Sequence, residues 1–312
     1  MENYPKNIMD FEKQFSTEEK CIEYISQLRW PNGFICPYCN NKKAWKIKIS
    51  KLECTECHRQ ISILAGSIFQ DSHKPIHIWF KAIWWIVTQK NGASALGIKR
   101  IMGFGSYKTA WTWLHKLRRA MIRPNRDNLS GLVEVDETIY GGEKSGKRGR
   151  GAENKVLIGI AVEDKLGKKI GRIRLGILSD ASQKSLTGFI KDKIVEGSVI
   201  RTDDWAGYNE IESQGYKRKI INKHELKLAH LVASLLKRWL LGTHQGAVSH
   251  EHLEYYLDEF TFRFNRRLST HRGKLFMRLI ENAIEINPVT YKMMIKGIRG
   301  KKLIKNHATC VK

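Results

Sequence analysis

Three acidic side chains fall within four residues of one short segment, and their close spacing is the first feature that points to chemistry. The segment reads GLVEVDETIYGG over residues 131–142, and its acids are Glu134, Asp136 and Glu137. Apolar and polar residues alternate between the flanking glycines, which predicts a short strand. Like charges this close repel and raise one another's pKa, so they do not stabilise a strand. The cluster therefore predicts a divalent-metal site around Asp136, and a solvated edge strand is the alternative.

A second set of metal-ligand residue types lies near the N-terminus. Cys36 and Cys39 form one CxxC pair, and Cys54 and Cys57 form another after fourteen intervening residues. Two such pairs at this distance are typical of a zinc ribbon, in which four thiolates surround one ion. Because four thiolates leave no position open for water, the predicted zinc is structural. Two unrelated redox pairs are the alternative interpretation.

The charge of the chain restricts the class of partner. The 312 residues include 55 Lys and Arg against 31 Asp and Glu, a formal net charge of +24. An excess of this size favours a polyanion, most simply DNA or RNA, over a membrane surface. The N-terminal residues lack the pattern of a signal peptide, and the longest apolar run, residues 78–87, is too short to span a bilayer. We therefore expect a cytoplasmic, nucleoid-associated protein with no membrane partner.

Helical patterns between the cysteines and the acidic strand predict a DNA-binding segment. Residues 93–102 and 107–121 are predicted helices joined by a glycine-containing turn, which is typical of a helix-turn-helix. Residues 36–130 carry 17 Lys and Arg against 4 Asp and Glu. We expect the second helix to contact double-stranded DNA, and an ordinary helical hairpin is the alternative. The candidate contact residues on that helix are Lys108, Lys116, Arg118 and Arg119.

Strand and helix patterns after residue 129 predict one mixed domain. Three strands lead to a helix at residues 182–193, and a fourth strand at residues 198–201 leads to Asp203. This order matches a ribonuclease H-like fold, in which the first and fourth strands lie side by side. Asp136 and Asp203 would then converge, as a pair of hard cations requires. A helix N-cap is the alternative role for Asp203.

The chain is thus predicted to be an α+β multidomain protein with four successive parts. They are a helix plus zinc ribbon at residues 17–65, a helix-turn-helix-like segment at residues 75–128, a ribonuclease H-like domain at residues 129–285 and a basic tail at residues 286–312. A basic loop at residues 143–153 interrupts the third part. Three arginines at the end of an aromatic helix are further candidates for DNA contact, and they are Arg263, Arg266 and Arg267.

Several motifs in one order resemble a known family. They are the zinc ribbon, VEVDETIYGG, RTDDWAGY, KRWLLGTH and YLDEFTFRFNRR. Together they are similar to insertion-sequence transposases with an acidic-triad (DDE-type) domain, in particular the ISXO2-like group, over about residues 20–285. The resemblance implies an enzyme that binds the terminal inverted repeats of an insertion sequence, cuts DNA and joins the cut end to target DNA. It also implies a homodimer or a larger assembly on the DNA.

The same resemblance implies roles for four side chains. By motif match, Asp136 is the first catalytic acid, Asp203 is the second, and His230 takes the third place, seven residues before Lys237. His230 lies at the start of a helix predicted over about residues 230–241. Many relatives carry Glu at this place, and an imidazole there favours Mn²⁺ somewhat over Mg²⁺. The three ligands would hold two Mg²⁺ or Mn²⁺ ions, and Lys237 would hold a phosphate oxygen.

Two other functions are compatible with the sequence. One is a catalytically inactive DNA-binding regulator with a zinc ribbon and a helix-turn-helix. Intact Asp136 and Asp203 favour the enzyme, whereas His230 in place of Glu, and Leu235 where a relative's Asn would sit, leave room for the regulator. The other is a ribonuclease H-like nuclease that cuts DNA without strand transfer. Metal-dependent nicking of the element's ends separates an enzyme from a regulator. Joining of the cut 3′ end to a target separates a transposase from a nuclease.

Overall fold

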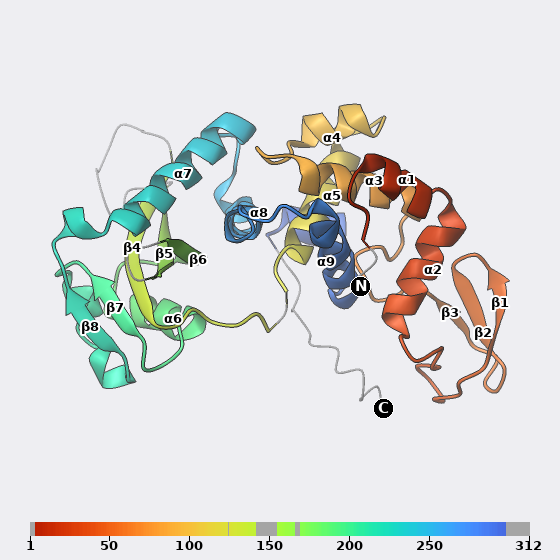
Figure 1. The fold of residues 1–312 in the computed structure, drawn as a ribbon, viewed down its shortest axis with the longest axis horizontal. Coiled ribbons are helices and arrows are strands. Elements are labelled where there is room, and N and C mark those ends of the chain that lie inside the picture. The colour runs from red at the N-terminus through yellow and green to blue at the C-terminus, as the bar shows by residue number, and fades with distance from the viewer. Residues whose placement is uncertain (1–3, 124, 142–154, 166–168, 298–312) are drawn as a thin grey trace. The chain divides into compact units, whose positions relative to one another are not determined.

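The chain divides into two compact units. The central unit is Arg126–Leu268, and the discontinuous unit combines Met1–Asn125 with Ser269–Lys312. The structure is a computed structural model (Figure 1), and it describes residues 4–123, 125–141, 155–165 and 169–297. The basic loop predicted at residues 143–153 lies outside these described residues, as does the part of the predicted tail after residue 297.

The cysteine-rich segment of the discontinuous unit forms a small antiparallel sheet. Its strands pair in the order β1-β2-β3, and they are β1 (Ala44–Lys48), β2 (Lys51–Cys54) and β3 (Gln60–Ser62). Lys48 lies opposite Lys51, so β1 and β2 form a hairpin with a two-residue turn. The sheet therefore carries Cys54 at the end of β2, next to the turn that holds Cys57.

Helices from both ends of the chain build the core of the discontinuous unit (Figure 1). They are α1 (Ile8–Gln14), α2 (Glu18–Arg29), α3 (Ile76–Thr88), α4 (Ala95–Ile101), α5 (Tyr107–Ala120), α9 (Arg272–Glu285) and α10 (Tyr291–Ile295). Trp79 of α3 stacks on Trp113 of α5 with ring centroids 3.5 Å apart. Phe276 of α9 packs edge-on against Phe80 of α3, with centroids 5.5 Å apart. Because α9 packs on α2, α3 and α5, the central unit ends at Leu268, earlier than the predicted boundary at residue 285.

The two helices predicted around the glycine-containing turn are present as α4 and α5. Gly103 follows α4 and adopts a φ of +62°, a left-handed conformation that glycine tolerates without strain. Ser106 then caps α5, because its hydroxyl accepts a hydrogen bond from the Lys108 backbone N–H at 3.1 Å. α5 therefore begins at Tyr107 as predicted, whereas α4 spans Ala95–Ile101, inside the predicted residues 93–102.

The central unit is built on a five-stranded sheet with the order β6-β5-β4-β7-β8. The strands are β4 (Leu132–Tyr140), β5 (Val156–Asp164), β6 (Ile170–Leu178), β7 (Val199–Thr202) and β8 (Lys217–Ile220). β4 pairs antiparallel with β5 and parallel with β7. Since β4 is the first strand of this unit and β7 is the fourth, their predicted adjacency is confirmed.

Helices cover the two faces of this sheet. They are α6 (Gln183–Lys193), α7 (Lys227–His244) and α8 (Leu253–Asn265). Val133 and Val135 of β4 pack with Phe189 of α6 in one apolar core. Successive side chains of a strand point to opposite faces, so Glu134 and Asp136 point to the other face. There α7 crosses β4 and β5 (Figure 1), while α8 packs on β6.

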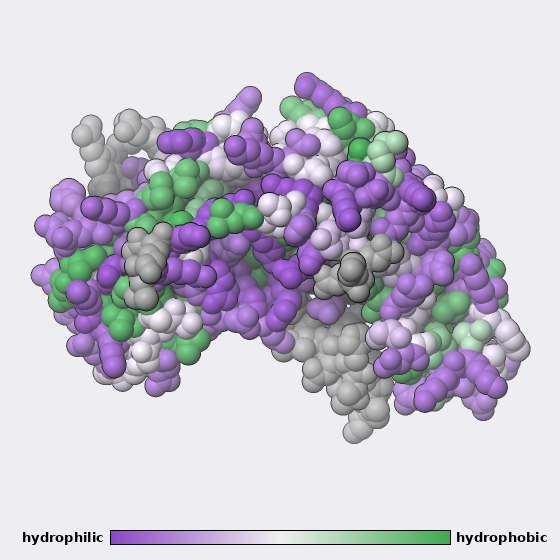
Figure 2. Space-filling model, in the orientation of Figure 1, coloured by the Kyte–Doolittle hydropathy of each residue, from purple (hydrophilic) through white to green (hydrophobic). Residues whose placement is uncertain are grey.

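The surface of the chain is largely polar. Hydrophilic residues dominate the face in Figure 2, with apolar residues scattered between them, as expected of a chain with a net charge of +24. In the part of the chain that the structure describes, no helix combines the length and the apolar character needed to cross a membrane.

An ion pair between a buried carboxylate and a half-exposed guanidinium joins β5 to the edge strand β6. Glu163 of β5 is 6% exposed, and Arg172 Nε of β6 donates to both of its carboxylate oxygens at 3.1 and 3.0 Å. The Arg172 backbone N–H donates to the same carboxylate at 3.1 Å. Burial raises the pKa of Glu163, but the hydrogen bonds and charge of Arg172 outweigh it, so the carboxyl pKa lies below its usual range. The pair therefore stabilises the charged form of Glu163 in the folded state.

We expect Glu163→Gln to lower the free energy of unfolding by about 1–3 kcal/mol near neutral pH, because Arg172 loses a charged acceptor. Glu163 has a lower pKa folded than unfolded, so its contribution is present above the unfolded pKa and is lost as the pH falls through the folded pKa. Urea titrations from neutral pH downward should show the gap between wild type and variant closing. A gap that does not change with pH would rule out an ionic origin.

Candidate functional site

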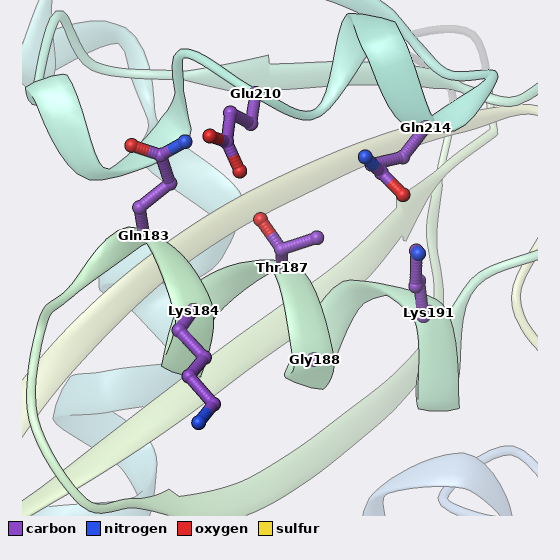
Figure 3. Close-up of a pocket in the computed structure, with 7 residues that line it drawn as sticks. All are labelled: Gln183, Lys184, Thr187, Gly188, Lys191, Glu210 and Gln214. Atoms are coloured by element: carbon purple, nitrogen blue, oxygen red, sulfur yellow. The ribbon is translucent and has the colours of Figure 1, made fainter.

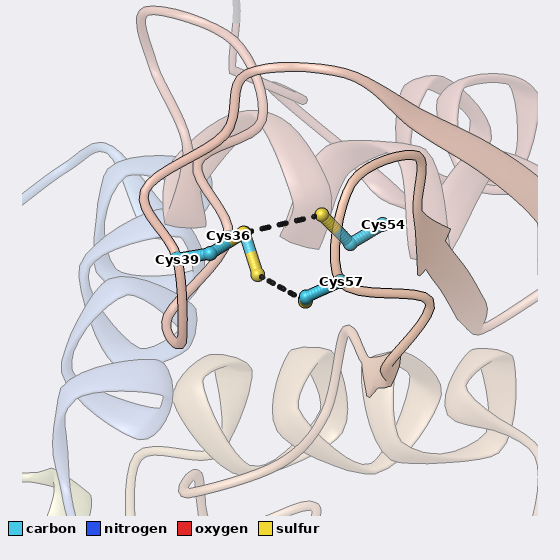
Figure 4. A group of neighbouring side chains, drawn as sticks. All are labelled: Cys36, Cys39, Cys54 and Cys57. Carbon is cyan, nitrogen blue, oxygen red and sulfur yellow. Dashed lines mark hydrogen bonds between the residues drawn. The ribbon is translucent and has the colours of Figure 1, made fainter.

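The four predicted zinc ligands lie together in the discontinuous unit (Figure 4). Their sulfur atoms all fall within 4.8 Å of one another, with Cys36 Sγ 3.7 Å from Cys57 Sγ and Cys39 Sγ 3.5 Å from Cys54 Sγ. Four sulfurs at about 2.3 Å from a tetrahedral Zn²⁺ are about 3.8 Å apart, so this spacing fits the ion. The predicted grouping of the four cysteines is therefore confirmed.

Hydrogen-bond donors around Cys54 favour a thiolate. Burial opposes the charged form of Cys54, yet the backbone N–H groups of Cys57 and Glu56 and the side chain of Asn41 donate to it and bring its pKa below the usual range. Asn41 also donates to Thr55 Oγ1 at 2.7 Å, which ties the first cysteine turn to the second. Such donors hold ligating sulfurs in place around a structural ion.

Asp136 and His230 meet on the face of the sheet that α7 covers. Asp136 is 8% exposed, and its Oδ2 lies 3.2 Å from Nε2 of His230. Its other oxygen, Oδ1, accepts a hydrogen bond from the Glu137 backbone N–H at 2.8 Å. The His230 side chain is 39% exposed, so the pair is open to solvent on the side of the imidazole. A buried carboxylate beside a partly exposed imidazole is a suitable donor pair for a divalent cation.

Asp203 follows β7, next to β4, and its charge acts on Asp136. Burial is the main cause that raises the pKa of Asp136, and the negative charge of Asp203 raises it further. The Glu137 backbone N–H, His230 and Lys223 act in the opposite direction. A bound cation would offset the repulsion between these two carboxylates. Among the described residues, however, the three predicted ligands do not form a group whose ligand atoms all lie within 4.8 Å of one another.

Arg218 of β8 holds the loop that carries Asp203. Its guanidinium Nη2 donates to the carbonyl oxygens of Asp203 and Trp205 at 3.0 and 3.2 Å, and its Nε donates to Thr202 Oγ1 at 3.0 Å. Asp203 Oδ1 accepts a hydrogen bond from the Trp205 backbone N–H at 3.2 Å. The Asp203 side chain thus also closes a local turn, which is close to the capping role that the sequence left open.

Two residues that the sequence did not single out also shape this site. The Tyr208 hydroxyl is buried and donates to Glu137 Oε2 at 2.7 Å. Burial raises the pKa of Tyr208 well above its usual range, and the neighbouring carboxylates of Glu137, Asp136 and Asp203 add to this effect, so the phenol remains a donor. Lys223, just before α7, supplies a positive charge that acts on Asp136. Tyr208 ends the RTDDWAGY motif, so its sequence position was a usable signal.

Lys237 lies on the exposed surface of α7, seven residues after His230. Seven residues are about two helical turns, so the two side chains leave the helix on nearly the same side. The contact of Lys237 with a phosphate oxygen stays a prediction.

The basic residues predicted to contact DNA from the second half of α5 have internal roles. Arg118 and Arg119 are each 1% exposed. Arg118 Nη2 donates to the Ala93 carbonyl at 3.4 Å, and Arg119 Nη1 donates to the Asn287 carbonyl at 2.9 Å. These guanidinium groups tie α5 to neighbouring segments of the discontinuous unit. The predicted DNA contacts of Arg118 and Arg119 therefore do not fit their position in the structure.

The two candidate lysines of α5, Lys108 and Lys116, differ in how far their charge is exposed to solvent. Lys116 Nζ donates to the Ile68 carbonyl at 3.1 Å, and burial lowers the pKa of this ammonium group. Lys108, at the start of the helix, is exposed, and its ammonium lies 4.1 Å from the centre of the Tyr291 ring. Of the two, only Lys108 presents its charge at the surface.

The three arginines at the end of α8 also make contacts inside the central unit. Arg263 Nε donates to the fully buried Glu259 at 2.8 Å. The guanidinium groups of Arg266 and Arg267 each lie 4.3 Å from the centre of an aromatic ring of the same helix. Arg267 also donates to the Ile170 carbonyl of β6. These contacts join α8 to the sheet, and a role of the three arginines in DNA binding stays a prediction.

A separate polar pocket of about 500 Å³ lies on the outer side of α6 (Figure 3). Its lining residues are Gln183, Lys184, Thr187, Gly188, Lys191, Glu210 and Gln214. Because α6 covers the sheet face opposite to α7, this pocket is not part of the site around Asp136.

Comparison with known proteins gives two matches to described families. Residues 128–265 match the ISXO2-like transposase domain, and residues 16–60 match the transposase zinc-ribbon domain. The chain is also 26% identical over 306 residues to an uncharacterized protein in transposable element ISH50 of Halobacterium salinarum, and the match covers 86% of this chain and 97% of that protein. The first family match contains Asp136, Asp203 and His230, and the second contains all four cysteines of the ribbon.

Proposed function

We propose that this chain, which carries a transposase zinc ribbon followed by an ISXO2-like transposase domain, is the transposase of an insertion sequence. One observation carries the proposal: inside the matched transposase domain, Asp136 lies on β4 and Asp203 directly follows β7, the parallel strand beside it. The sheet order β6-β5-β4-β7-β8 with helices on both faces supports a ribonuclease H-like fold for the central unit. A DDE-type active site on such a fold would cut DNA strands and transfer them.

Asp136, Asp203 and His230 are the residues that would hold two Mg²⁺ or Mn²⁺ ions. When bound, such ions supply an activated attacking oxygen and charge stabilisation for the leaving oxygen of a phosphodiester. The donor set fits this role for two reasons. The carboxylates of Asp136 and Asp203 repel each other, and the Nε2 atom of the His230 imidazole faces Asp136. The imidazole of His230 would favour Mn²⁺ somewhat over Mg²⁺.

Basic surfaces of the discontinuous unit would bind the DNA. The ribbon hairpin presents five exposed lysines, which are Lys42, Lys43, Lys46, Lys48 and Lys51. Lys108 at the start of α5 adds a charge on the helix-turn-helix-like segment. Affinity that arises from such contacts with phosphates falls steeply with salt. We propose that the bound DNA is the element's terminal inverted repeats and the target, with the chain assembled on it as a homodimer or a larger oligomer.

The test incubates the purified chain with DNA that carries the element's ends, in Mg²⁺ and separately in Mn²⁺. We expect nicking at the ends, followed by joining of a 3′ end to a second DNA. Nicking without joining would indicate a nuclease, and binding to the ends without nicking in either metal would indicate a regulator. If the chain binds the ends no better than unrelated DNA of the same length, the transposase proposal fails.

A further inference from the structure

The first turn of α7 has no capping side chain of its own. Leu226 is the residue at the N-cap, and no side-chain hydrogen bond comes from it. Glu134 of β4 supplies the acceptor instead, because its Oε2 accepts hydrogen bonds from the backbone N–H groups of Leu228 at 2.9 Å and Ala229 at 3.0 Å. An α-helix leaves these first N–H groups without an internal partner. A strand residue therefore caps this helix from outside.

The Glu134 carboxylate is also held from its other side. Its Oε1 lies 3.9 Å from Arg201 Nη1 of β7, and the same nitrogen donates to Asp164 Oδ2 of β5 at 2.8 Å. Glu134 is only 3% exposed. Its carboxylate would therefore have to break these contacts in order to reach solvent. The contacts fix the start of α7 against three neighbouring strands of the sheet.

The capped turn carries the candidate ligand His230. Glu134 and Asp136 are two residues apart on the same face of β4, and both reach this turn. Asp136 Oδ2 meets His230 Nε2 at 3.2 Å, one residue after the capped Ala229. We propose that Glu134 is a positioning residue, whose carboxylate fixes the first turn of α7 so that the imidazole of His230 lies beside Asp136. The inference rests on the proposed function, in which Asp136 and His230 are metal ligands.

Position and charge can be separated by two substitutions at Glu134. Glu134→Gln keeps the length of the side chain and an oxygen that accepts hydrogen bonds, but it removes the charge. Glu134→Asp keeps the charge, but it is one methylene shorter and cannot reach both N–H groups in the same geometry. If Glu134 acts by position, Gln is the milder change. If it acts through its negative charge near the ions, Asp is the milder change.

The experiment measures Mn²⁺ binding to the full-length, zinc-loaded chain by electron paramagnetic resonance, without DNA. We expect Glu134→Asp to weaken Mn²⁺ binding about tenfold or more and Glu134→Gln to stay within about threefold of wild type, since groups that orient a metal ligand typically affect affinity by about 10–100-fold. Asp192→Ala is the matched control, because Asp192 is an exposed carboxylate, 70% accessible, in the same unit. It should bind Mn²⁺ as the wild type does.

Amide hydrogen exchange at Leu228 and Ala229 is the second measurement, and it needs only the Glu134→Gln variant. These amides should stay protected from exchange in Glu134→Gln, and the Mn²⁺ affinity of this variant should stay near that of the wild type. If Glu134→Gln keeps its amides protected but binds Mn²⁺ tenfold more weakly than the wild type, the positioning role is overturned. It is also overturned if folded Glu134→Asp binds Mn²⁺ as tightly as the wild type, or more tightly than Glu134→Gln does.

Asp136→Asn, titrated in parallel, separates the failure of this inference from that of the proposed function. If Asp136→Asn binds Mn²⁺ like wild type, the ions are not held at this site and the proposed function fails with the inference. If Asp136→Asn loses Mn²⁺ while Glu134→Asp does not, only the positioning role of Glu134 is overturned.

Discussion

Asp136→Asn should lower metal-dependent strand cleavage by about a thousandfold or more while DNA binding remains intact. The substitution removes a negative ligand from a buried position and keeps the shape of the side chain. It should not reduce stability, because burial and the charge of Asp203 raise the pKa of Asp136, which shows that the charged form is disfavoured in the folded state. Cleavage of end-bearing DNA, affinity for the same DNA and thermal unfolding together check the expectation.

Two neighbouring substitutions sharpen this test. Asp203→Asn should be as severe as Asp136→Asn, whereas Asp204→Asn changes the adjacent, exposed carboxylate of the same loop and should leave cleavage near wild type. His230→Ala should also be severe, and His230→Glu should recover part of the activity in Mg²⁺, a cation that prefers oxygen. Normal cleavage by Asp136→Asn would exclude the proposed active site altogether.

The double substitution Cys36→Ser, Cys39→Ser should release the zinc and unfold the ribbon. Its three strands have five, four and three residues. Its buried cluster consists of Cys36, Cys54 and Ile61, with Trp30, Phe34 and Cys57 packed around it. A core this small cannot offset the entropy of ordering the segment, so metal binding, about 10–16 kcal/mol in zinc-finger peptides, must contribute to folding.

Metal analysis of the wild type should find about one zinc per chain, and the double variant should have none. Limited proteolysis should then cut the variant within residues 30–62 while the central unit persists. Cys310→Ser, which changes a cysteine far from the ribbon in the sequence, serves as the control and should retain the metal. Wild-type protein without zinc, or a zinc-free variant with a protease-resistant ribbon, would show that the four cysteines do not form a structural zinc site.

Strand order and cysteine spacing could be predicted because local patterns determine them. Alternation marks β4, and the succession of strands and helices after it sets β7 at its side, so the approach of Asp203 to Asp136 follows from topology. The two CxxC pairs form tight turns that need only a hairpin to meet. In both cases the information lies in short segments and their order.

Contacts between distant segments could not be predicted in this way. The sequence predicts DNA contacts for Arg118 and Arg119, because a count of basic residues does not reveal which guanidinium groups bind backbone carbonyls in a core. The capping role of Glu134 also depends on a contact between distant segments, so it could not be predicted either. α7 begins at Lys227 rather than near residue 230, so the amides that Glu134 binds lay outside the predicted helix.

The placement of α9 has a consequence for how the protein is made. Phe276 of α9 fills the same aromatic cluster as Phe11, Phe15 and Phe80, which the ribosome has produced about 200 to 265 residues earlier. All 143 residues of Arg126–Leu268 are synthesised in the interval. The central unit is therefore complete on the nascent chain before the discontinuous unit has its last helix. A gene copy cut short before codon 272 still encodes the ribbon and all three candidate metal ligands, but it lacks the helix that closes the core of the other unit.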